Sequence, residues 1–265
     1  MAIKKYTAES NNTIVNAFEP NFSTRATGSN MGLSDVVEVY SIYGRVTTSS
    51  QEISRVLMQF PISDIASDRT AGTVPSSGSV SFYLKVFNAE HASTTPVDYT
   101  LTVNPVSQSW QPGDGLDLES YTDKTRGNRG SNWMSASNST RWQTAVPDIR
   151  PAIGGSYITS STDFIYEQTF STGLEDLHIN ITPMVESWIA GTIENYGVLI
   201  KLSASFEASA SLAQKTEQDD LGKAGVIVND DGATKSYYTK RFFARGTEFF
   251  FKKPVIEARW NDSKK

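Results

Sequence analysis

A short loop rich in carboxylates is the first place in this sequence where residue types suggest chemistry. Asp114, Asp117 and Glu119 lie within the stretch GDGLDLE, and Asp123 follows closely. A calcium ion takes about six to eight oxygen ligands, and carboxylates on a glycine-containing loop supply such ligands. The spacing differs from that of an EF-hand. Two interpretations stay open: a calcium site formed by Asp114, Asp117 and Glu119, or a solvated acidic loop, which is the simpler of the two.

Groups suited to covalent catalysis are scarce. The chain has no cysteine, which excludes disulfides, zinc–thiolate sites and a cysteine nucleophile. Around its two histidines, His91 and His178, no nucleophile, base and orienting group can be nominated together. Carboxylate pairs for glycoside hydrolysis depend on a spatial separation that a sequence does not give. We therefore predict a protein that is not an enzyme and has no cofactor, unless the acidic loop binds calcium.

Aromatic and basic residues form two further candidate contact sites. Trp133 and Trp142 lie in a long Gly-, Ser- and Asn-rich excursion. As exposed rings they would stack on sugars or on a partner protein, and as buried rings they would form a small core that orders the loop. Lys240 and Arg241 lie among aromatic residues near the C-terminus. They suit an acidic partner surface, or simply the solvated face of a strand.

Residues 177–202 carry the clearest local signals, which predict a strand, a short helix and a second strand. Thr182 is predicted as the N-cap and Pro183 as the first helical residue, because a hydroxyl accepts from a free backbone N–H and proline lacks that donor. Trp188 belongs to the apolar stripe, and Gly191 is placed to end the helix. A helix this short must be held by packing. We predict a structural centre in which Trp188 is buried at one end of the fold.

Alternating apolar residues predict at least eight strands, one short helix and no βαβ units. The predicted fold is all-β, an antiparallel β-sandwich or jelly roll with long surface loops. Residues 1–34 are predicted to form an extended arm with a first strand, and residues 35–265 the sandwich domain. Loop excursions are predicted at about 111–155 and 203–234. The strands beyond the arm are predicted within residues 36–43, 52–61, 80–89, 99–103, 164–170, 177–181, 198–202, 237–243 and 249–260, with a single helical turn at 62–65.

The composition argues against several classes of partner. A formal net charge of -5 and a pI near 5.2 argue against general binding to nucleic acid. No apolar run approaches the roughly 20 residues that a membrane-spanning helix needs. The opening MAIKKYTAES lacks the apolar core of a secretory signal. We expect a protein that is made and used without export and that contacts neither membrane nor nucleic acid.

Five segments, taken in order, resemble one family of β-sandwich domains. They are SRVLMQFPIS (54–63), SVSFYLKVFNA (79–89), YTLTVNPVSQSW (99–110), LHINITPMVESWIAG with NYGVLIKL (177–202) and FFFKKPVIEARW (249–260). Their order resembles the DNRLRE type of carbohydrate-binding-module-like jelly roll, over roughly residues 36–260. More narrowly, GDGLDLESYTD, GSNWMSAS and KSYYTKRFFARGTEFFFKKPVIEARWND are similar to segments of virion structural proteins of tailed phages.

This resemblance implies a non-enzymatic phage virion protein, either a capsid decoration or cement subunit or a surface subunit of the neck or tail. Such a protein would bind other capsid or tail proteins in multiple symmetric copies and would reside in the virion after assembly in the host cytoplasm. The alternative is a carbohydrate-binding module or receptor-binding fibre domain. In that case host glycans would stack on Trp133 or Trp142.

Overall fold

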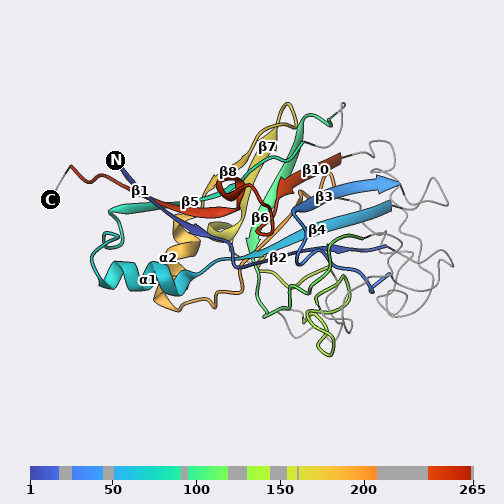
Figure 1. Cartoon of the computed structure of the whole chain (residues 1–265), viewed down its shortest axis with the longest axis horizontal. Helices are drawn as coiled ribbons and strands as arrows, with labels where there is room; N and C mark the ends of the chain where they lie inside the picture. Colours follow the sequence, from blue (N-terminus) through green and yellow to red (C-terminus); the bar gives the residue numbers. More distant parts are fainter. Residues whose placement is uncertain are drawn as a thin grey trace.

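The computed structural model describes residues 1–17, 26–43, 51–90, 95–118, 130–143, 154–159, 161–207 and 238–263 of the chain. Within these residues, eleven strands form two antiparallel sheets, accompanied by two α-helices (Figure 1). The predicted all-β antiparallel sandwich is therefore confirmed. No helix in the described ranges is long and apolar enough to span a membrane.

Four strands form the smaller sheet, and its two central strands, β11 and β5, each pair with a neighbour on both sides. The order is β1 (Ala2–Thr7), β11 (Val255–Trp260), β5 (Val80–Val86) and β8 (Leu177–Asn180). Every second residue of β5 is buried, as its alternating sequence predicts. Ile256 lies opposite both Leu84 and Tyr6, so a row of apolar side chains crosses this sheet on its inner face.

Seven strands form the larger sheet. Along its main path the order is β10 (Tyr238–Phe243), β3 (Val36–Tyr43), β4 (Gln51–Gln59), β9 (Val198–Leu202), β6 (Tyr99–Pro105) and β7 (Tyr166–Phe170). The seventh strand, β2 (Ser10–Val15), pairs with β4 beside β3. The predicted strands of the sequence correspond to these elements within a few residues, with one exception near the C-terminus.

The N-terminal residues belong to the sandwich itself. β1 pairs with β11 of the smaller sheet, and β2 pairs with β4 of the larger sheet. Between them, the Ala8 and Glu9 N–H groups donate to the carbonyls of Pro254 and Gln59 at 2.9 and 2.8 Å. The boundary predicted after residue 34 therefore has no counterpart in the strand pairing of the described residues.

Hydrogen bonds join the two sheets along two edges. Past the end of β5, Asn88 forms an isolated bridge with Phe242 of β10. At another edge the Gln168 side chain of β7 accepts from the His178 N–H at 2.7 Å and donates to the Asp176 carbonyl at 2.8 Å. The sandwich is thus tied together by backbone and side-chain bonds as well as by its apolar core.

Two short helices lie together beside the core between the sheets. They are α1 (Ile62–Thr70) and α2 (Thr182–Ala190), linked by Arg69 and Glu186 through two hydrogen bonds of 2.7 Å. Trp188 is buried in the main core, as predicted. Helix α1 has nine residues where the sequence predicts one turn, because Ile62 and Ile65 are both buried against this core.

The ends of α2 were only partly predicted. Gly191 adopts the left-handed conformation with φ of 71°, as predicted. Pro183, predicted as the first helical residue, is the second, because α2 begins at Thr182. Thr182 is wrong as the N-cap, since Ile181 holds that position. The Thr182 hydroxyl instead accepts from the Phe82 N–H of β5 at 2.8 Å and donates to Asn180 at 2.7 Å. It therefore fastens the helix to the smaller sheet.

The larger sheet is covered on both faces. In β4, Val56 and Met58 face the core between the sheets, while Leu57 faces a second buried cluster. That cluster explains why all five residues of β9 are buried. Segments 106–118, 130–143 and 154–159 supply its other side, and together they are called the loop layer (Figure 1). The buried residues of the cluster are Ile14, Ile53, Leu57, Val106, Trp110, Trp133, Met134, Ala136, Trp142 and Leu199.

The last predicted strand begins later than the sequence indicates. The stretch 249–254 is not part of a strand: Phe250–Lys252 forms a short 3-10 helix, η4, and β11 starts at Val255. A second 3-10 turn, η2 (Thr162–Phe164), precedes β7. The strand prediction failed at 249–254 because consecutive phenylalanines suit a strand by propensity, whereas here they point into solvent.

Candidate interaction surface

The two tryptophans predicted as contact residues lie inside the molecule. Trp133 and Trp142 are 4% and 1% exposed, so their prediction as ligand-stacking or partner-contact rings is wrong. The alternative interpretation, a small core that orders the loop, is confirmed. The Trp142 Nε1–H donates to the Asn132 carbonyl at 2.8 Å, and the Trp110 Nε1–H donates to the Tyr196 carbonyl at the same distance. Buried indoles commonly find such acceptors.

A turn at Asn132 places these rings. The Asn132 side-chain oxygen accepts from the N–H groups of Met134 and Ser135 at 2.9 and 3.0 Å, and the Asn132 N–H donates to the Ser135 carbonyl. Asparagine favours such local bonds because its short amide reaches the backbone two or three residues ahead. The GSNWMSAS stretch therefore folds as a compact unit that directs Trp133 toward the sheet.

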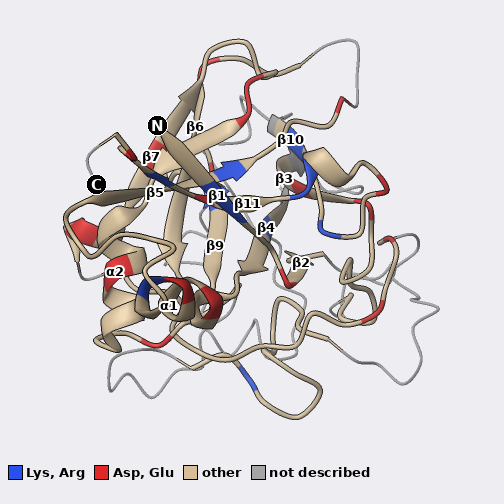
Figure 2. Ribbon diagram, turned by 60° about the vertical axis from the view of Figure 1, so that its left-hand side comes forward, with Lys and Arg blue, Asp and Glu red and all other residues tan. Residues whose placement is uncertain are grey.

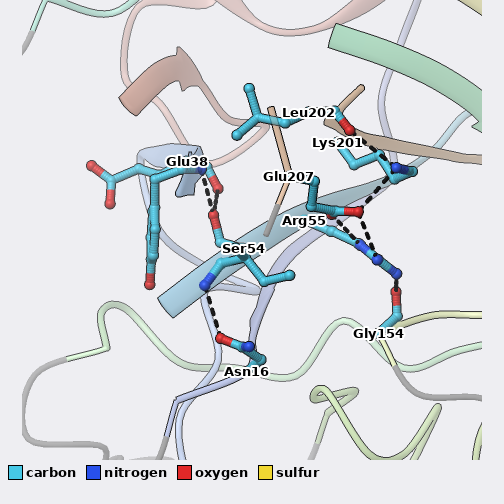
Figure 3. A network of polar contacts seen from close by, with 10 residues as sticks. Asn16, Glu38, Ser54, Arg55, Gly154, Lys201, Leu202 and Glu207 are labelled. Atoms are coloured by element: carbon cyan, nitrogen blue, oxygen red, sulfur yellow. Dashed lines mark hydrogen bonds and ion pairs between the residues drawn. The ribbon is translucent and has the colours of Figure 1, made fainter. Parts of the chain in front are cut away.

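Arg55 of β4 fastens the loop layer to the sheet (Figure 3). Its guanidinium donates to both carboxylate oxygens of Glu207, at 2.7 and 2.9 Å, and to the Gly154 carbonyl at 2.6 Å. The Trp133 and Tyr157 rings lie 4.8 and 5.6 Å from its central carbon, within the range of cation–π attraction. Arg55 thus joins the sheet, the loop layer and the chain that follows β9.

Lys201 of β9 completes this network. Its ammonium donates to Glu207 at 3.0 Å and to the Leu202 carbonyl at 3.0 Å. Burial by itself would raise the pKa of Glu207, but Arg55 and Lys201 beside it hold that pKa below its ordinary value. We call Arg55, Lys201 and Glu207 the Glu207 cluster. Its charges satisfy one another, so it acts as an anchor.

The acidic loop shows no cation site in the described part of the chain. Asp114 is half-buried and Asp117 is exposed, while Glu119 lies outside the described residues. Among the described residues, no group of three or more His, Cys, Asp or Glu is placed to hold a metal. The loop is held instead by Asn30, whose side-chain oxygen accepts from the Gly115 N–H at 2.7 Å. The calcium interpretation therefore has no support from the described residues.

Lys240 and Arg241 do not form an open basic patch. Lys240 is 1% exposed, so its prediction as a partner contact is wrong. Arg241 is partly exposed, and its Nε donates to the Glu38 carboxylate of β3 at 2.7 Å. On β10 the two side chains leave opposite faces, and each finds its partners within the chain.

The histidines contribute no catalytic arrangement to the described residues. His178 lies on the outer face of the smaller sheet, where its Nε2 is 2.9 Å from an Arg259 nitrogen and its ring is 5.3 Å from that of Tyr83. Burial, together with Arg259 and Lys85, lowers its pKa below the ordinary value. His91 lies outside the described residues.

The most exposed aromatic feature was missed by the sequence analysis. Phe249, Phe250 and Phe251, called the phenylalanine triplet, are 56%, 71% and 84% exposed. The triplet lies at the 3-10 helix η4, where the Lys252 N–H donates to the Phe249 carbonyl at 2.8 Å. Phe250 and Phe251 lie within η4 with ring centres 5.4 Å apart, and Phe249, directly before η4, packs edge-on against Phe243 with ring centres 5.6 Å apart. The three rings therefore form a knob of which Phe250 and Phe251 are the most exposed part.

The base of this knob is fixed. The Phe249 N–H donates to the buried Thr247 hydroxyl at 3.3 Å, and the Arg245 N–H donates to the Asn11 side chain at 3.1 Å. On the other side the Pro254 carbonyl accepts from the chain between β1 and β2. The triplet is therefore held out by buried neighbours on both sides.

Positive charge lies on one side of the triplet, at Lys252, and extends over the outer face of the smaller sheet. The ammonium groups of Lys252 and Lys85 lie 5.2 and 4.7 Å from the centre of the Phe87 ring. This basic region contrasts with the net charge of -5 of the whole chain. Figure 2 shows lysine and arginine along β1, β5 and β11, and carboxylates on α1 and α2. The cations are Lys5, Lys85, Lys252 and Arg259, with Glu257 between Lys5 and Arg259.

Comparison with known proteins assigns no family. No protein-family model matches the chain, and no curated protein matches it. The resemblance of its segments to DNRLRE-type domains and phage virion proteins stays a prediction.

Proposed function

We propose that this chain is a non-enzymatic structural subunit of a phage virion that acts through protein–protein contacts. The phenylalanine triplet is the observation that carries this proposal. Exposed apolar patches on a fixed base mark contact sites more often than solvated surface does. The order of family-like segments in the sequence supports the phage assignment, and a surface position on head, neck or tail follows from it.

The triplet suits a neighbouring virion protein that offers an apolar socket with an acidic rim. Burying a phenylalanine side chain contributes about 1.5–3 kcal/mol, so two or three rings offset a large part of the cost of association, and an already ordered loop keeps that cost low. Lys252, which follows the triplet directly, and Lys85, which shares the Phe87 ring with it, complement carboxylates on such a rim. Repetition of this contact around a symmetric particle would place many copies on it.

Burial of Trp133 and Trp142 removes the rings on which the glycan-binding alternative was based. A sugar ring stacks on an exposed aromatic face, and neither indole offers one. We therefore place the contact function at the phenylalanine triplet.

Quantitative mass spectrometry of washed particles tests this proposal. Particles of the phage that encodes the chain should contain it in a fixed ratio to the major capsid protein. With Phe250→Ser and Phe251→Ser combined, occupancy should fall at least about tenfold, because losing the burial of two rings exceeds the roughly 1.4 kcal/mol that a tenfold change requires. Val97→Ser, which alters another exposed apolar side chain, is the matched control and should leave occupancy unchanged.

Two results would contradict the proposal in different ways. If the wild-type chain is absent from washed particles, the virion role is wrong. If wild type and the double serine variant are retained equally, the virion role stands and the triplet is not its contact.

A further inference from the structure

Lys240 is buried against acceptors that are all neutral. Its Nζ donates to the side-chain oxygen of Asn88 at 2.7 Å, to the Gly173 carbonyl at 2.8 Å and to the Glu175 carbonyl at 2.7 Å. The rings of Phe170 and Phe242 lie 4.9 and 5.2 Å from the same nitrogen. This arrangement brings a primary amine into direct contact with a carboxamide inside a largely apolar enclosure.

The enclosure favours the reactive, neutral form of the amine. Burial lowers the pKa of Lys240 to about 8, against the opposing influence of the nearby carboxylates of Glu175 and Asp176. A substantial fraction of the amine is therefore neutral near pH 8. A neutral amine has two N–H groups and one lone pair. If the two N–H groups stay on the carbonyls of Gly173 and Glu175, the lone pair is directed toward Asn88.

We propose that Lys240 and Asn88 form an intramolecular isopeptide bond that joins the two sheets of the sandwich covalently. The geometry points to these two residues because Asn88 follows β5 of the smaller sheet and Lys240 lies on β10 of the larger sheet. Their backbones are already held together, since the Ala89 N–H donates to the Arg241 carbonyl at 3.0 Å. This inference does not depend on the proposed virion role.

The reaction balances without an oxidant, reductant or cofactor. The lone pair of the neutral Lys240 Nζ attacks Cγ of Asn88, and the carbonyl becomes a tetrahedral oxyanion. One proton moves from Nζ to the Asn88 side-chain nitrogen. Re-formation of the carbonyl then breaks the bond from Cγ to that nitrogen, which departs as ammonia. The product is an amide between Nζ of Lys240 and Cγ of Asn88.

Glu175, whose carboxylate charge acts on Lys240, is the group proposed to carry the proton. Its Oε1 accepts from the N–H groups of Ser171 and Thr172 at 2.9 and 2.8 Å, which fixes the carboxylate. Its Oε2 is buried and has no hydrogen-bond partner among the residues that the structure describes. The backbone carbonyl of the same residue contacts Nζ of Lys240. Although burial opposes the charge, the N–H groups around the carboxylate keep its pKa below the ordinary value, so it is ionised and acts electrostatically on Lys240.

Lys201 provides a matched comparison within the same chain. It is also buried, but its Nζ donates to the carboxylate of Glu207 and to the Leu202 carbonyl. Its nitrogen therefore contacts a carboxylate and a backbone carbonyl, and neither contact is a side-chain carboxamide. Lys201 should therefore remain unmodified.

Intact-mass spectrometry of the purified, denatured full-length chain tests the inference. The wild-type chain should be lighter than its sequence by one ammonia, and a protease digest should yield a branched peptide that joins Asn88 to Lys240. Lys240→Arg and Asn88→Ala should each restore the full mass, while Lys201→Arg should keep the loss. A succinimide at Asn88 would also remove ammonia, but it would persist in Lys240→Arg and give no branched peptide.

The role of Glu175 has its own measurement. Glu175→Gln keeps the size of the side chain but cannot accept the proton, so bond formation, followed by mass after cell-free synthesis of each chain, should be about 100-fold slower. Far-UV circular dichroism establishes that each variant is folded. A folded wild-type chain with the full mass and no branched peptide overturns the bond, and an unchanged rate in Glu175→Gln overturns the role of the carboxylate.

Discussion

The Glu207 cluster and the surroundings of Lys240 bury positive charge in two different ways. On the outer face of the larger sheet, Arg55 and Lys201 share the carboxylate of Glu207 at 2.7 and 3.0 Å. Where the two sheets meet, Lys240 faces the Asn88 amide and two backbone carbonyls. In the Glu207 cluster the positive charges are compensated by a negative charge. Around Lys240 the ammonium contacts the dipoles of carbonyl groups and the faces of aromatic rings.

This difference has a chemical consequence. A carboxylate next to a buried ammonium favours the charged form of both groups, and the result is a stable but unreactive anchor. Around Lys240 the direct acceptors are neutral, and the carboxylates of Glu175 and Asp176 offset the cost of burying the charge only in part, so the amine gives up its proton more readily. The same residue type is thus an anchor at position 201 and a nucleophile at position 240.

Removing the Lys240 amine should have the largest effect on stability. Lys240→Met keeps most of the side chain's contact with the aromatic rings but prevents the cross-link. In the chain-entropy model, a covalent link that closes a loop longer than 100 residues stabilises by about 5 kcal/mol. Urea denaturation should show a loss of that size. A loss no larger than that of Lys201→Met would contradict the difference between the two lysines.

Glu207→Ala should cost about 4 kcal/mol, because it leaves two buried cations without their carboxylate. Chemical denaturation measures this loss, and tryptophan fluorescence should show the loop layer opening, since Trp133 lies against Arg55. Lys201→Met is the control, since it leaves the pair of Arg55 and Glu207 intact and should cost much less. Equal losses in the two variants would show that the cluster does not depend on its carboxylate.

Gly154→Ala should cost about 3 kcal/mol in stability, of which roughly 1–2 kcal/mol is the strain of a left-handed alanine and the rest is the displacement of close neighbours. Gly154 has φ of +72°, and a Cβ there would lie 2.6 Å from Nη1 of Arg55 and 2.8 Å from the Trp133 ring. The added methyl group would push the guanidinium off its acceptors. Gly191→Ala is the control, since Gly191 also has positive φ but open space around it. If the two substitutions lower the free energy of unfolding equally, the close approach of neighbouring atoms at Gly154 does not contribute to the cost.

The smallest predicted effect is a dependence of stability on pH. The pKa of Glu207 is lowered in the folded chain, so its contribution to the free energy of unfolding is complete above its unfolded pKa. That contribution is lost as the pH falls through the folded pKa. Unfolding free energies measured from pH 7 to pH 3 should fall more steeply for wild type than for Glu207→Gln. Parallel curves would contradict the electrostatic role of this carboxylate.

The local sequence pattern was sufficient to predict most strands and the C-terminal end of α2. Alternation predicted β5, and Gly191 ended the helix where a left-handed residue was expected. Thr182 was misassigned because its hydroxyl bonds to Phe82, which is 100 residues away in the sequence. A local motif cannot report such a partner.

The candidate sites were predicted less well, for a related reason. Trp133, Trp142 and Lys240 have the side chains of surface contacts, yet all three are buried. Their burial depends on the loop layer covering the larger sheet and on Asn88 lying beside β10. The prediction for the phenylalanine triplet was wrong in the opposite sense. Its apolar residues were expected in a strand, but in the structure they point into solvent.

The sequence by itself determined the class of fold, the positions of most strands and the boundaries of α2 within a residue or so. These features depend on backbone preference and on the period of apolar residues, which are local properties. Only the tertiary structure decided which aromatic residues are inside and which lysine meets a carboxamide. Arg55 and Glu207 are separated by 152 residues, and so are Asn88 and Lys240. Contacts over that distance arise from the packing of layers, and no local pattern encodes them.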